Sequence, residues 1–368
     1  MNLLTLLIGN NVNFLYGFID YFTKDNEFFK CDKVLLVYTE KTKDIFNNIK
    51  NFFNVEIEGI NIGDDVRNIE KIESAIREKL DELKPKKIHL NYTGGTKSMG
   101  IGAFLVVDKY KCEDKIFSDI DFSKKIYLKR GDIFPKNGTF EDLVHFKIKD
   151  LLTLEGFRLK GYKTQNSEFF NERFVKFLFD KLENEEKGFF VELWDKKFKE
   201  LKSLNWKDSL KEVPIDIENI SNKKLEKLQR FIRGVFLEEY LFYVLNKYKD
   251  ELKIDDILWN VEILNKEGAE FELDVVVSKG YTLYGFSVTT DKTKKLIKSK
   301  TFEVDKRVEE ISGIGGKFVV VGFGDKEEME RVKKEIGDKR NRGGYDVIGK
   351  EELLDENKLL EKLKAIFR

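Results

Sequence analysis

The run Ile88-His-Leu-Asn-Tyr-Thr-Gly-Gly-Thr-Lys-Ser-Met99 is the most informative stretch of this chain, because it joins a predicted strand to a predicted helix. Apolar residues predict a buried strand over 87–91, and a helical pattern begins at about 96 and continues to 109. The backbone N–H groups of residues 94–98 then lie at the positive end of the helix dipole, where phosphate groups bind readily. Lys97 adds a cation to the same place.

The two glycines in this run allow two explanations. Gly94 and Gly95 fit neither the spacing of a P-loop nor the G-x-G-x-x-G pattern of dinucleotide-binding folds, which argues against ordinary ATP or NAD binding. A glycine pair also closes a tight strand-to-helix turn without any ligand. The phosphate-binding hypothesis has as its candidate residues Thr93, Gly94, Gly95, Thr96, Lys97 and Ser98.

Short apolar runs in the first third of the chain alternate with helical patterns, which predicts a parallel, doubly wound sheet. In such sheets, ligands gather at the carboxyl ends of the strands. Gly9, Asn10 and Asn11 follow the first run, so we expect this polar loop to form one pocket with the glycine loop. The predicted strands are 3–8, 33–38, 55–60, 87–91 and 115–120.

Length and composition limit the class of protein. A chain of 368 residues is long for one core, so we expect domains at 1–146 and 225–368, joined by a helical connector at 147–224. The 67 basic residues balance 67 acidic ones, which argues against a generally cationic nucleic-acid-binding surface. Two distant cysteines and two histidines argue against a zinc site or a disulfide framework. No apolar run reaches membrane-spanning length, so we expect a cytoplasmic protein without a membrane partner.

The last part of the chain has the element order of small metal-dependent nucleases. This order of helix, strand meander, helix and strand predicts a second α/β domain. The expected elements are a long helix over 225–248, strands near 261–264, 273–277 and 283–288, a helix over 301–311 and a strand over 317–322.

Acidic residues in this part are candidate metal ligands. Glu238 is the one charge on an otherwise apolar face of the long helix. Glu272 and Asp274 lie on the same side of a strand by the alternation of side chains, and carboxylate oxygens are ligands that suit Mg²⁺ and Mn²⁺. The simpler alternative is that Glu272 faces solvent and that the lysines near residue 300 are ordinary surface residues.

The neighbouring strand carries hydroxyl groups where a metal nuclease usually has a carboxylate and a lysine. Ser287 and the Val288 carbonyl could complete a metal shell, and a downstream lysine could stabilise charge at the scissile phosphate. Lys300 is our candidate for this role, with Lys298 or neither as the alternatives. The predicted catalytic residues are Glu238, Asp274, Ser287 and Lys300, and the predicted metal ligands are Glu238, Asp274 and Val288.

Both ends of the chain together resemble the CRISPR ancillary nucleases that join an N-terminal CARF domain, a CRISPR-associated Rossmann fold, to a C-terminal PD-(D/E)xK nuclease domain. Residues 91–99 are similar to the ligand loop of CARF domains, and 9–12 to their first-strand loop. Residues 234–240 resemble the opening helix of the nuclease fold, and 272–274 its acidic strand. The chain departs from the family at Ser287-Val-Thr289, where the pattern has (D/E)-x-K.

This resemblance implies a Rossmann-like domain, a restriction-endonuclease-like α/β domain and a homodimer that binds a cyclic oligoadenylate, with cyclic tetra-adenylate as the first expectation. It also implies Mg or Mn as cofactor and DNA or RNA as substrate. The missing (D/E)-x-K leaves open a second hypothesis, in which the protein is a sensor whose nuclease-like half has lost catalysis. In a third, Thr96, Lys97 and Ser98 position a ribose hydroxyl so that the CARF domain cleaves its own ligand.

Overall fold

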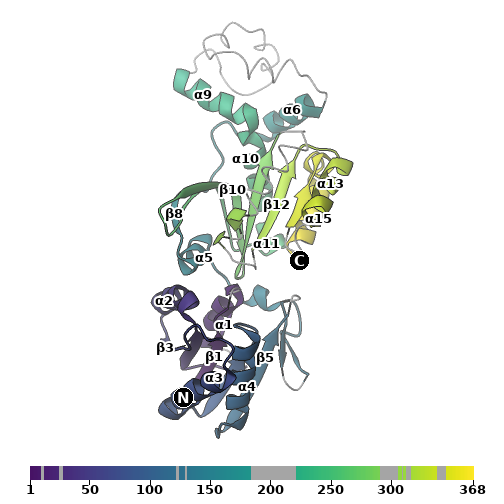
Figure 1. The fold of residues 1–368 in the computed structure, drawn as a ribbon. Helices are drawn as coiled ribbons and strands as arrows, with labels where there is room; N and C mark the ends of the chain where they lie inside the picture. Colours follow the sequence, from purple (N-terminus) through teal and green to yellow (C-terminus); the bar gives the residue numbers. More distant parts are fainter. Residues whose placement is uncertain are drawn as a thin grey trace.

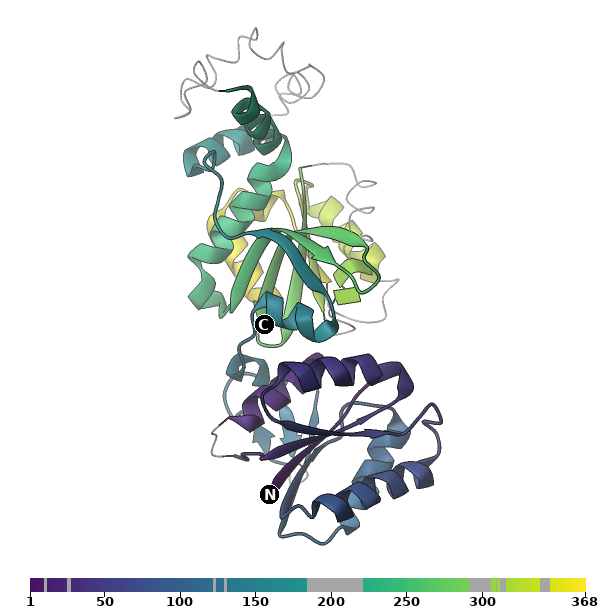
Figure 2. The same ribbon diagram turned by 90° about the vertical axis from the view of Figure 1, so that its left-hand side faces the viewer.

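Two β-sheets organise the chain, one in each of two domains stacked end to end (Figure 1 and Figure 2). The computed structural model describes residues 1–9, 12–24, 28–121, 124–128, 131–183, 221–290, 306–308, 310–311, 316–337 and 345–368. No helix among these residues is both long and apolar enough to cross a membrane.

The first sheet has the strand order β3-β2-β1-β4-β5-β6-β7. Strands β1 to β5 are parallel, which confirms the doubly wound arrangement predicted from the apolar runs. Strands β6 and β7 extend one edge in the antiparallel sense. The bounds are β1 (Asn2–Leu7), β2 (Lys33–Tyr38), β3 (Glu56–Asn61), β4 (Lys87–Asn91), β5 (Asp114–Ile120), β6 (Ile126–Leu128) and β7 (Ile133–Phe134).

Helices cover both faces of this sheet. Because side chains alternate along β1, Leu4 and Leu6 pack with α1 and α2, whereas Leu3 and Leu7 pack with α3 and α4. The chain order reverses between β1 and β4, and such a switch point leaves a crevice at the carboxyl ends of the strands. The bounds are α1 (Asn13–Thr23), η1 (Glu40–Thr42), α2 (Lys43–Phe52), α3 (Ile69–Leu83), α4 (Lys97–Lys109) and η2 (Phe140–Leu143).

The second sheet has the strand order β13-β12-β11-β10-β9-β8. Neighbours from β8 to β11 are antiparallel, whereas β11, β12 and β13 are parallel. The strands are β8 (Arg158–Lys163), β9 (Asp256–Leu264), β10 (Glu270–Lys279), β11 (Thr282–Thr289), β12 (Lys317–Gly322) and β13 (Tyr345–Ile348).

Helices also cover this second sheet on both sides. Apolar residues of α6, α10 and α15 pack against one face, and those of α5 and α13 pack against the other. This arrangement confirms a second α/β domain. The helices are α5 (Ile148–Glu155), α6 (Glu172–Glu183), α9 (Asn222–Arg230), α10 (Phe236–Lys247), α11 (Lys249–Leu252), α13 (Lys326–Gly337), α14 (Lys350–Leu353) and α15 (Glu356–Ile366).

Two predictions for the middle of the chain are wrong in part. The predicted helical connector at 147–224 contains β8, an edge strand paired with β9. Exposed basic side chains alternate there with Leu159 and Gly161, and so weak an apolar pattern did not indicate a strand. The predicted helix over 225–248 is interrupted by a π-helical turn at Phe231–Val235, which separates α9 from α10. Residues 184–220 and most of the predicted helix at 301–311 lie outside the described residues.

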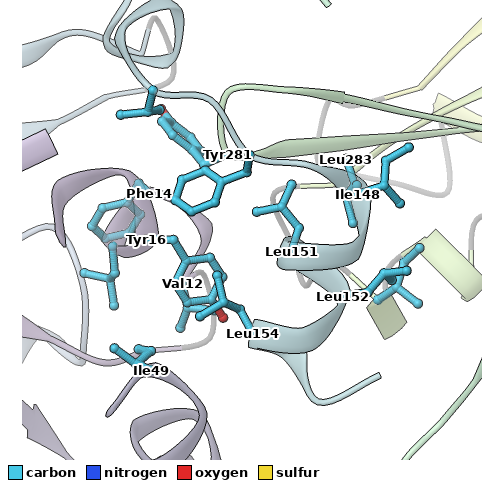
Figure 3. Close-up of a cluster of buried hydrophobic side chains, with 14 of the residues drawn as sticks. Val12, Phe14, Tyr16, Ile49, Ile148, Leu151, Leu152, Leu154, Tyr281 and Leu283 are labelled. Atoms are coloured by element: carbon cyan, nitrogen blue, oxygen red, sulfur yellow. The ribbon is translucent and has the colours of Figure 1, made fainter. Parts of the chain in front are cut away.

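The two domains share a hydrophobic core (Figure 3). Val12, Phe14 and Tyr16 of the first domain lie in the same cluster as the apolar face of α5. Tyr281 and Leu283, at the start of β11, join this cluster from the second domain. Interiors of this kind are close-packed, so a displacement in one domain is felt in the other.

Hydrogen bonds reinforce the junction between the domains. The Ser278 hydroxyl donates to the Phe146 carbonyl oxygen at 2.7 Å. The Tyr16 hydroxyl of α1 donates to Glu155 Oε1 of α5 at 2.9 Å, and burial raises the pKa of Glu155 to about 7. The second of these bonds ties α1 of the first domain to α5 at the junction.

Candidate functional site

A pocket of about 460 Å³ opens at the carboxyl edge of the first sheet, where the loops after β1, β2, β3 and β4 meet. Its volume lies within the roughly 300–1,000 Å³ of ordinary ligand sites. The structure brings the two predicted loops together there, since Gly9 and residues 93–96 line the pocket. Lys97 and Ser98 are not among its lining residues. Asn10 and Asn11 lie outside the described residues.

Close contact between the two loops explains their glycines. A Cβ atom on Gly94 would lie 1.9 Å from the Leu7 carbonyl oxygen, and one on Gly9 would lie 2.7 Å from the Gly95 nitrogen. Gly95 also has a φ of +73°, which side-chain-bearing residues rarely adopt. The glycines are therefore required by the tight turn, and the same residues also form part of the pocket wall.

Strand β5 holds the glycine loop in place. The Thr93 hydroxyl donates to Asp119 Oδ1 at 2.7 Å and accepts the Ile120 N–H at 2.8 Å. Asn91 Oδ1 accepts the Thr93 N–H at 3.2 Å, and Asn91 Nδ2 donates to the Ser118 hydroxyl at 3.1 Å. The sequence patterns did not indicate these β5 partners, because the pairing of β4 with β5 is visible only in the folded sheet.

The first turn of α4 presents free backbone donors near the pocket. Thr96 is the N-cap residue: its hydroxyl accepts the Met99 N–H at 3.2 Å, and its own N–H contacts the Met99 sulfur at 3.4 Å. Among the described residues, no hydrogen-bond acceptor contacts the N–H groups of Gly95, Lys97 and Ser98. Helix N-termini with unpaired N–H groups bind anions readily, and phosphate binding at this end of α4 stays a prediction.

The opposite wall of the pocket comes from residues that the sequence patterns did not indicate. It consists of η1, after β2, and the loop after β3, with Lys41 and Asp64 as its charged side chains. Thr39 and Thr42 brace η1, because the Thr39 N–H donates to the Thr42 hydroxyl at 3.0 Å. The sequence did contain a signal for this wall, because polar residues follow β2 and β3 at the carboxyl edge where ligands bind in parallel sheets.

A second candidate site lies in the other sheet, where β10 and β11 pair. Asp274 Oδ2 accepts the Val288 N–H at 2.6 Å and lies 3.5 Å from the Ser287 hydroxyl. The ladder between β9 and β10 is interrupted at Asp274 and at Asn260, which has a φ of +50°. The structure thus brings together Asp274, Ser287 and Val288, as the sequence predicted.

The buried acid of α10 is Glu239 rather than Glu238. Glu239 is only 1% exposed, its Oε2 accepts the Ser167 N–H at 2.7 Å, and burial raises its pKa. Glu238 is part-buried. The sequence placed one acid, Glu238, toward the core, but α10 is buried around most of its circumference, so Glu239 is buried as well. A π-helical turn precedes α10. This turn reaches the end of β11, since the Thr290 hydroxyl lies 3.5 Å from the Arg233 carbonyl oxygen.

Metal binding at this second site remains a prediction. The described residues contain no group of three or more Asp, Glu, His or Cys side chains that could hold a metal ion. Mg²⁺, however, keeps several of its waters and binds proteins through only one or two carboxylates. Glu238 and Asp274 are carboxylates of the kind that it requires. Glu272 is exposed, as the simpler alternative predicted. The candidate lysines, Lys298 and Lys300, lie outside the described residues.

Comparisons with known proteins bear on both domains. Residues 14–149 match the family model described as the Card1 CARF domain, which supports the CARF-type fold predicted for the first domain. No curated protein matches the chain.

The whole chain shares its fold with two solved structures. One is protein VC1899 from Vibrio cholerae, with a TM-score of 0.69 and 16% identity, covering 100% of this chain and 98% of that one. The other is Can2 from Sulfobacillus thermosulfidooxidans, solved in complex with cyclic tetra-adenylate, with a TM-score of 0.67, 17% identity and coverage of 98% and 96%. A type III CRISPR defence DNA nuclease activated by cyclic oligoadenylate matches at a TM-score of 0.51 and 14% identity, covering 88% of this chain and 45% of that one.

Proposed function

We propose that this protein is a nuclease of CRISPR antiviral defence that is activated by a cyclic oligoadenylate and depends on a divalent metal. The observation that carries the proposal is the pocket between the β1 and β4 loops, a cavity of about 460 Å³ beside the start of α4, whose first N–H groups have no acceptor among the described residues. The fold shared with Can2, whose structure contains cyclic tetra-adenylate, supports this ligand as the first choice.

A homodimer follows from the symmetry of such a ligand. A cyclic tetra-adenylate has a two-fold axis, so two copies of the pocket related by the same axis would each bind half of the ring. The exposed end of α4, with Thr96 and Lys97, would then face the ligand in both copies. Chromatographic sizing with light scattering tests the dimer.

The second sheet supplies the proposed hydrolytic site. Glu238 and Asp274, with the Val288 carbonyl, would hold Mg²⁺ or Mn²⁺, which would activate water and neutralise charge on the phosphate. The Val288 N–H bond orients the Asp274 carboxylate, and Ser287 lies beside it. Lys300 would stabilise charge at the scissile phosphate, because a lysine from the following segment could replace the one absent from β11.

Coupling between the sites would use the shared core. A ligand shifts an equilibrium only through different contacts in two states, and a packed junction converts a shift of α1 or α5 into a shift of β11. DNA and RNA are both kept as substrates in the proposal.

The test is a cleavage panel on the full-length protein. Cyclic tetra-adenylate and Mn²⁺ are added to labelled single-stranded RNA, single-stranded DNA and plasmid, with wild type, Asp274→Asn and the control Glu270→Gln. Glu270 lies on the same strand and pairs with Lys160 on the surface. We expect ligand-dependent cutting by wild type and Glu270→Gln only. Absence of cutting of every substrate by wild type would refute the nuclease.

Two alternatives rest on specific observations. Ser287-Val-Thr289 in place of (D/E)-x-K favours a sensor without catalysis, which would bind ligand in calorimetry but show no cleavage that Asp274→Asn removes. The Thr96 hydroxyl at the pocket wall favours cleavage of the ligand itself. Incubating the ring with Asp274→Asn protein and finding it intact by chromatography would exclude that activity.

A further inference from the structure

Lys41 is the basic side chain that the described residues contribute to the pocket. Of these residues, the charged ones that line the cavity are Lys41 and Asp64, and the predicted cation Lys97 does not line it. Asp64 only accepts hydrogen bonds when ionised, so it repels phosphate and leaves Lys41 as the group that attracts it. Lys41 lies on η1, across the cavity from Gly95 and Thr96.

The neighbours of Lys41 are engaged elsewhere. Glu40 hydrogen-bonds Asn61 and lies 3.8 Å from the Lys43 ammonium group. Within the described part of the chain, Lys41 itself makes no ion pair, and its side chain is exposed. The Thr39 and Thr42 bonds fix the backbone of η1, and the flexible side chain of Lys41 extends from this fixed point at the pocket wall.

We propose that Lys41 binds a phosphate of the anionic ligand from the wall opposite the glycine loop. This inference rests on the proposed function for the identity of the ligand. A phosphate in the cavity would then contact backbone N–H groups on one side and an ammonium group on the other. Charge-assisted hydrogen bonds are about twice as strong as neutral ones, so losing the ammonium group lowers affinity by roughly 10- to 100-fold.

Calorimetry with cyclic tetra-adenylate tests this assignment on three variants of the full-length protein. Lys41→Met should weaken binding by about 10- to 100-fold. The matched control Lys43→Met, two residues along and paired with Glu40, should bind like wild type. The variant Lys97→Met should lose less affinity than Lys41→Met.

The possible outcomes distinguish the role of Lys41 from the proposed function as a whole. If wild type binds and Lys41→Met binds equally well, the role of Lys41 is refuted while the proposed function stands. If Lys97→Met loses more than Lys41→Met, the cation is Lys97 and the inference is again refuted. If wild type does not bind the ring at all, the proposed function and this inference fall together.

A different set of contacts leads from η1 to the second domain. Helix α2 follows η1 directly, and Asn48 of α2 donates to the Leu154 carbonyl oxygen of α5 at 3.0 Å. A Cβ atom on Gly156, at the end of α5, would lie 3.1 Å from Asn48 Nδ2 and 2.3 Å from Lys266 Cε. Lys266 lies in the turn between β9 and β10, and β10 carries Asp274.

We infer that α2 transmits ligand binding to the β9–β10 hairpin through Asn48 and Gly156. A movement of η1 towards the ligand displaces α2, and the Asn48 hydrogen bond to the Leu154 carbonyl passes that displacement to the end of α5, where Gly156 lies against Lys266. The hairpin then carries it along β10 to Asp274. A coupling route of this kind needs evidence of two states, not only of contact.

Hydrogen exchange supplies that evidence without relying on cleavage. Exchange of residues 262–272 is followed with and without saturating cyclic tetra-adenylate in wild type, Asn48→Ala, Lys266→Ala and Asn51→Ala. Asn51 is the matched control because it lies on α2 and is exposed. We expect the ligand to change exchange in wild type and Asn51→Ala, and not in Asn48→Ala or Lys266→Ala, all with ligand bound. An unchanged response in Asn48→Ala and Lys266→Ala, or none in ligand-bound wild type, would refute this route.

Discussion

The contact between Gly94 and β1 gives the sharpest test of the pocket. In Gly94→Ala the new Cβ would lie 1.9 Å from the Leu7 carbonyl oxygen and 3.0 Å from the Leu7 carbonyl carbon. Both are backbone atoms of the sheet, so no side-chain rotation relieves the clash. Overpacking usually costs about 1–3 kcal/mol, and we expect about 3 kcal/mol here because only backbone movement can accommodate the methyl group.

This cost predicts a measurable change in melting temperature. In domains of 150–250 residues, 1 kcal/mol corresponds to roughly 2–4 °C, so Gly94→Ala should melt about 6–12 °C below wild type. Thermal unfolding followed by circular dichroism measures the shift. Calorimetry with cyclic tetra-adenylate, below both melting temperatures, should show weaker binding, because the N–H groups move with the loop.

The matched control is Gly100→Ala, which lies six residues after Gly94 and inside α4. The nearest atom to its new Cβ is the Tyr92 carbonyl oxygen at 3.6 Å, an ordinary contact. Alanine in a helix is favoured over glycine by about 1 kcal/mol, so this variant should melt at or slightly above the wild-type temperature. If Gly94→Ala melts with the wild type and binds the ring equally well, the description of the loop contact is wrong.

Three further predictions follow from other contacts. Burial raises the pKa of Glu155 from 4.5 in the unfolded chain to about 7 in the folded protein, so between these pH values the native state holds a proton that the unfolded state has lost. The free energy of unfolding should therefore fall as the pH rises from 4.5 to 7, by at most about 3 kcal/mol. Glu155→Gln should flatten this pH dependence, as measured by denaturant unfolding. Ser118→Ala removes the partner of Asn91 and of His89 Nε2, 2.8 Å away, and should cost about 1–3 kcal/mol in the same assay. Chelation with EDTA should abolish ligand-dependent cleavage, and excess Mn²⁺ should restore it, without changing ring binding.

The fold of the first domain could be predicted from its sequence because its strands are buried on both faces. Runs such as 3–8 and 33–38 are nearly continuous in apolar residues, and this density indicates a parallel sheet with helices on both sides. Strand β8 was not predicted because most of its residues are exposed to solvent. As an edge strand it has Arg158 and Lys160 exposed, so it carries almost no apolar signal.

Some residues of the candidate site could be predicted from the sequence and others could not. Gly9 and the glycine loop could be predicted because phosphate-binding loops and close backbone contacts both demand glycine at specific positions. Lys41 could not, since a lysine in a charged segment has no local mark that distinguishes it from the surface lysines around it. Glu239 was missed because a periodicity argument assumes one buried face, whereas α10 is buried around most of its circumference.

The core shared by α1, α5 and the start of β11 has a practical consequence for protein engineering. Cutting the chain near residue 146 would expose Val12, Phe14 and the ring of Tyr16 to water on one fragment and Tyr281 on the other. Newly exposed hydrophobic surfaces of this kind promote aggregation, so we expect neither fragment to be well behaved on its own. A fragment that contains the first domain would have to keep α5, and would need polar substitutions at the apolar positions that contact Tyr281 and Leu283.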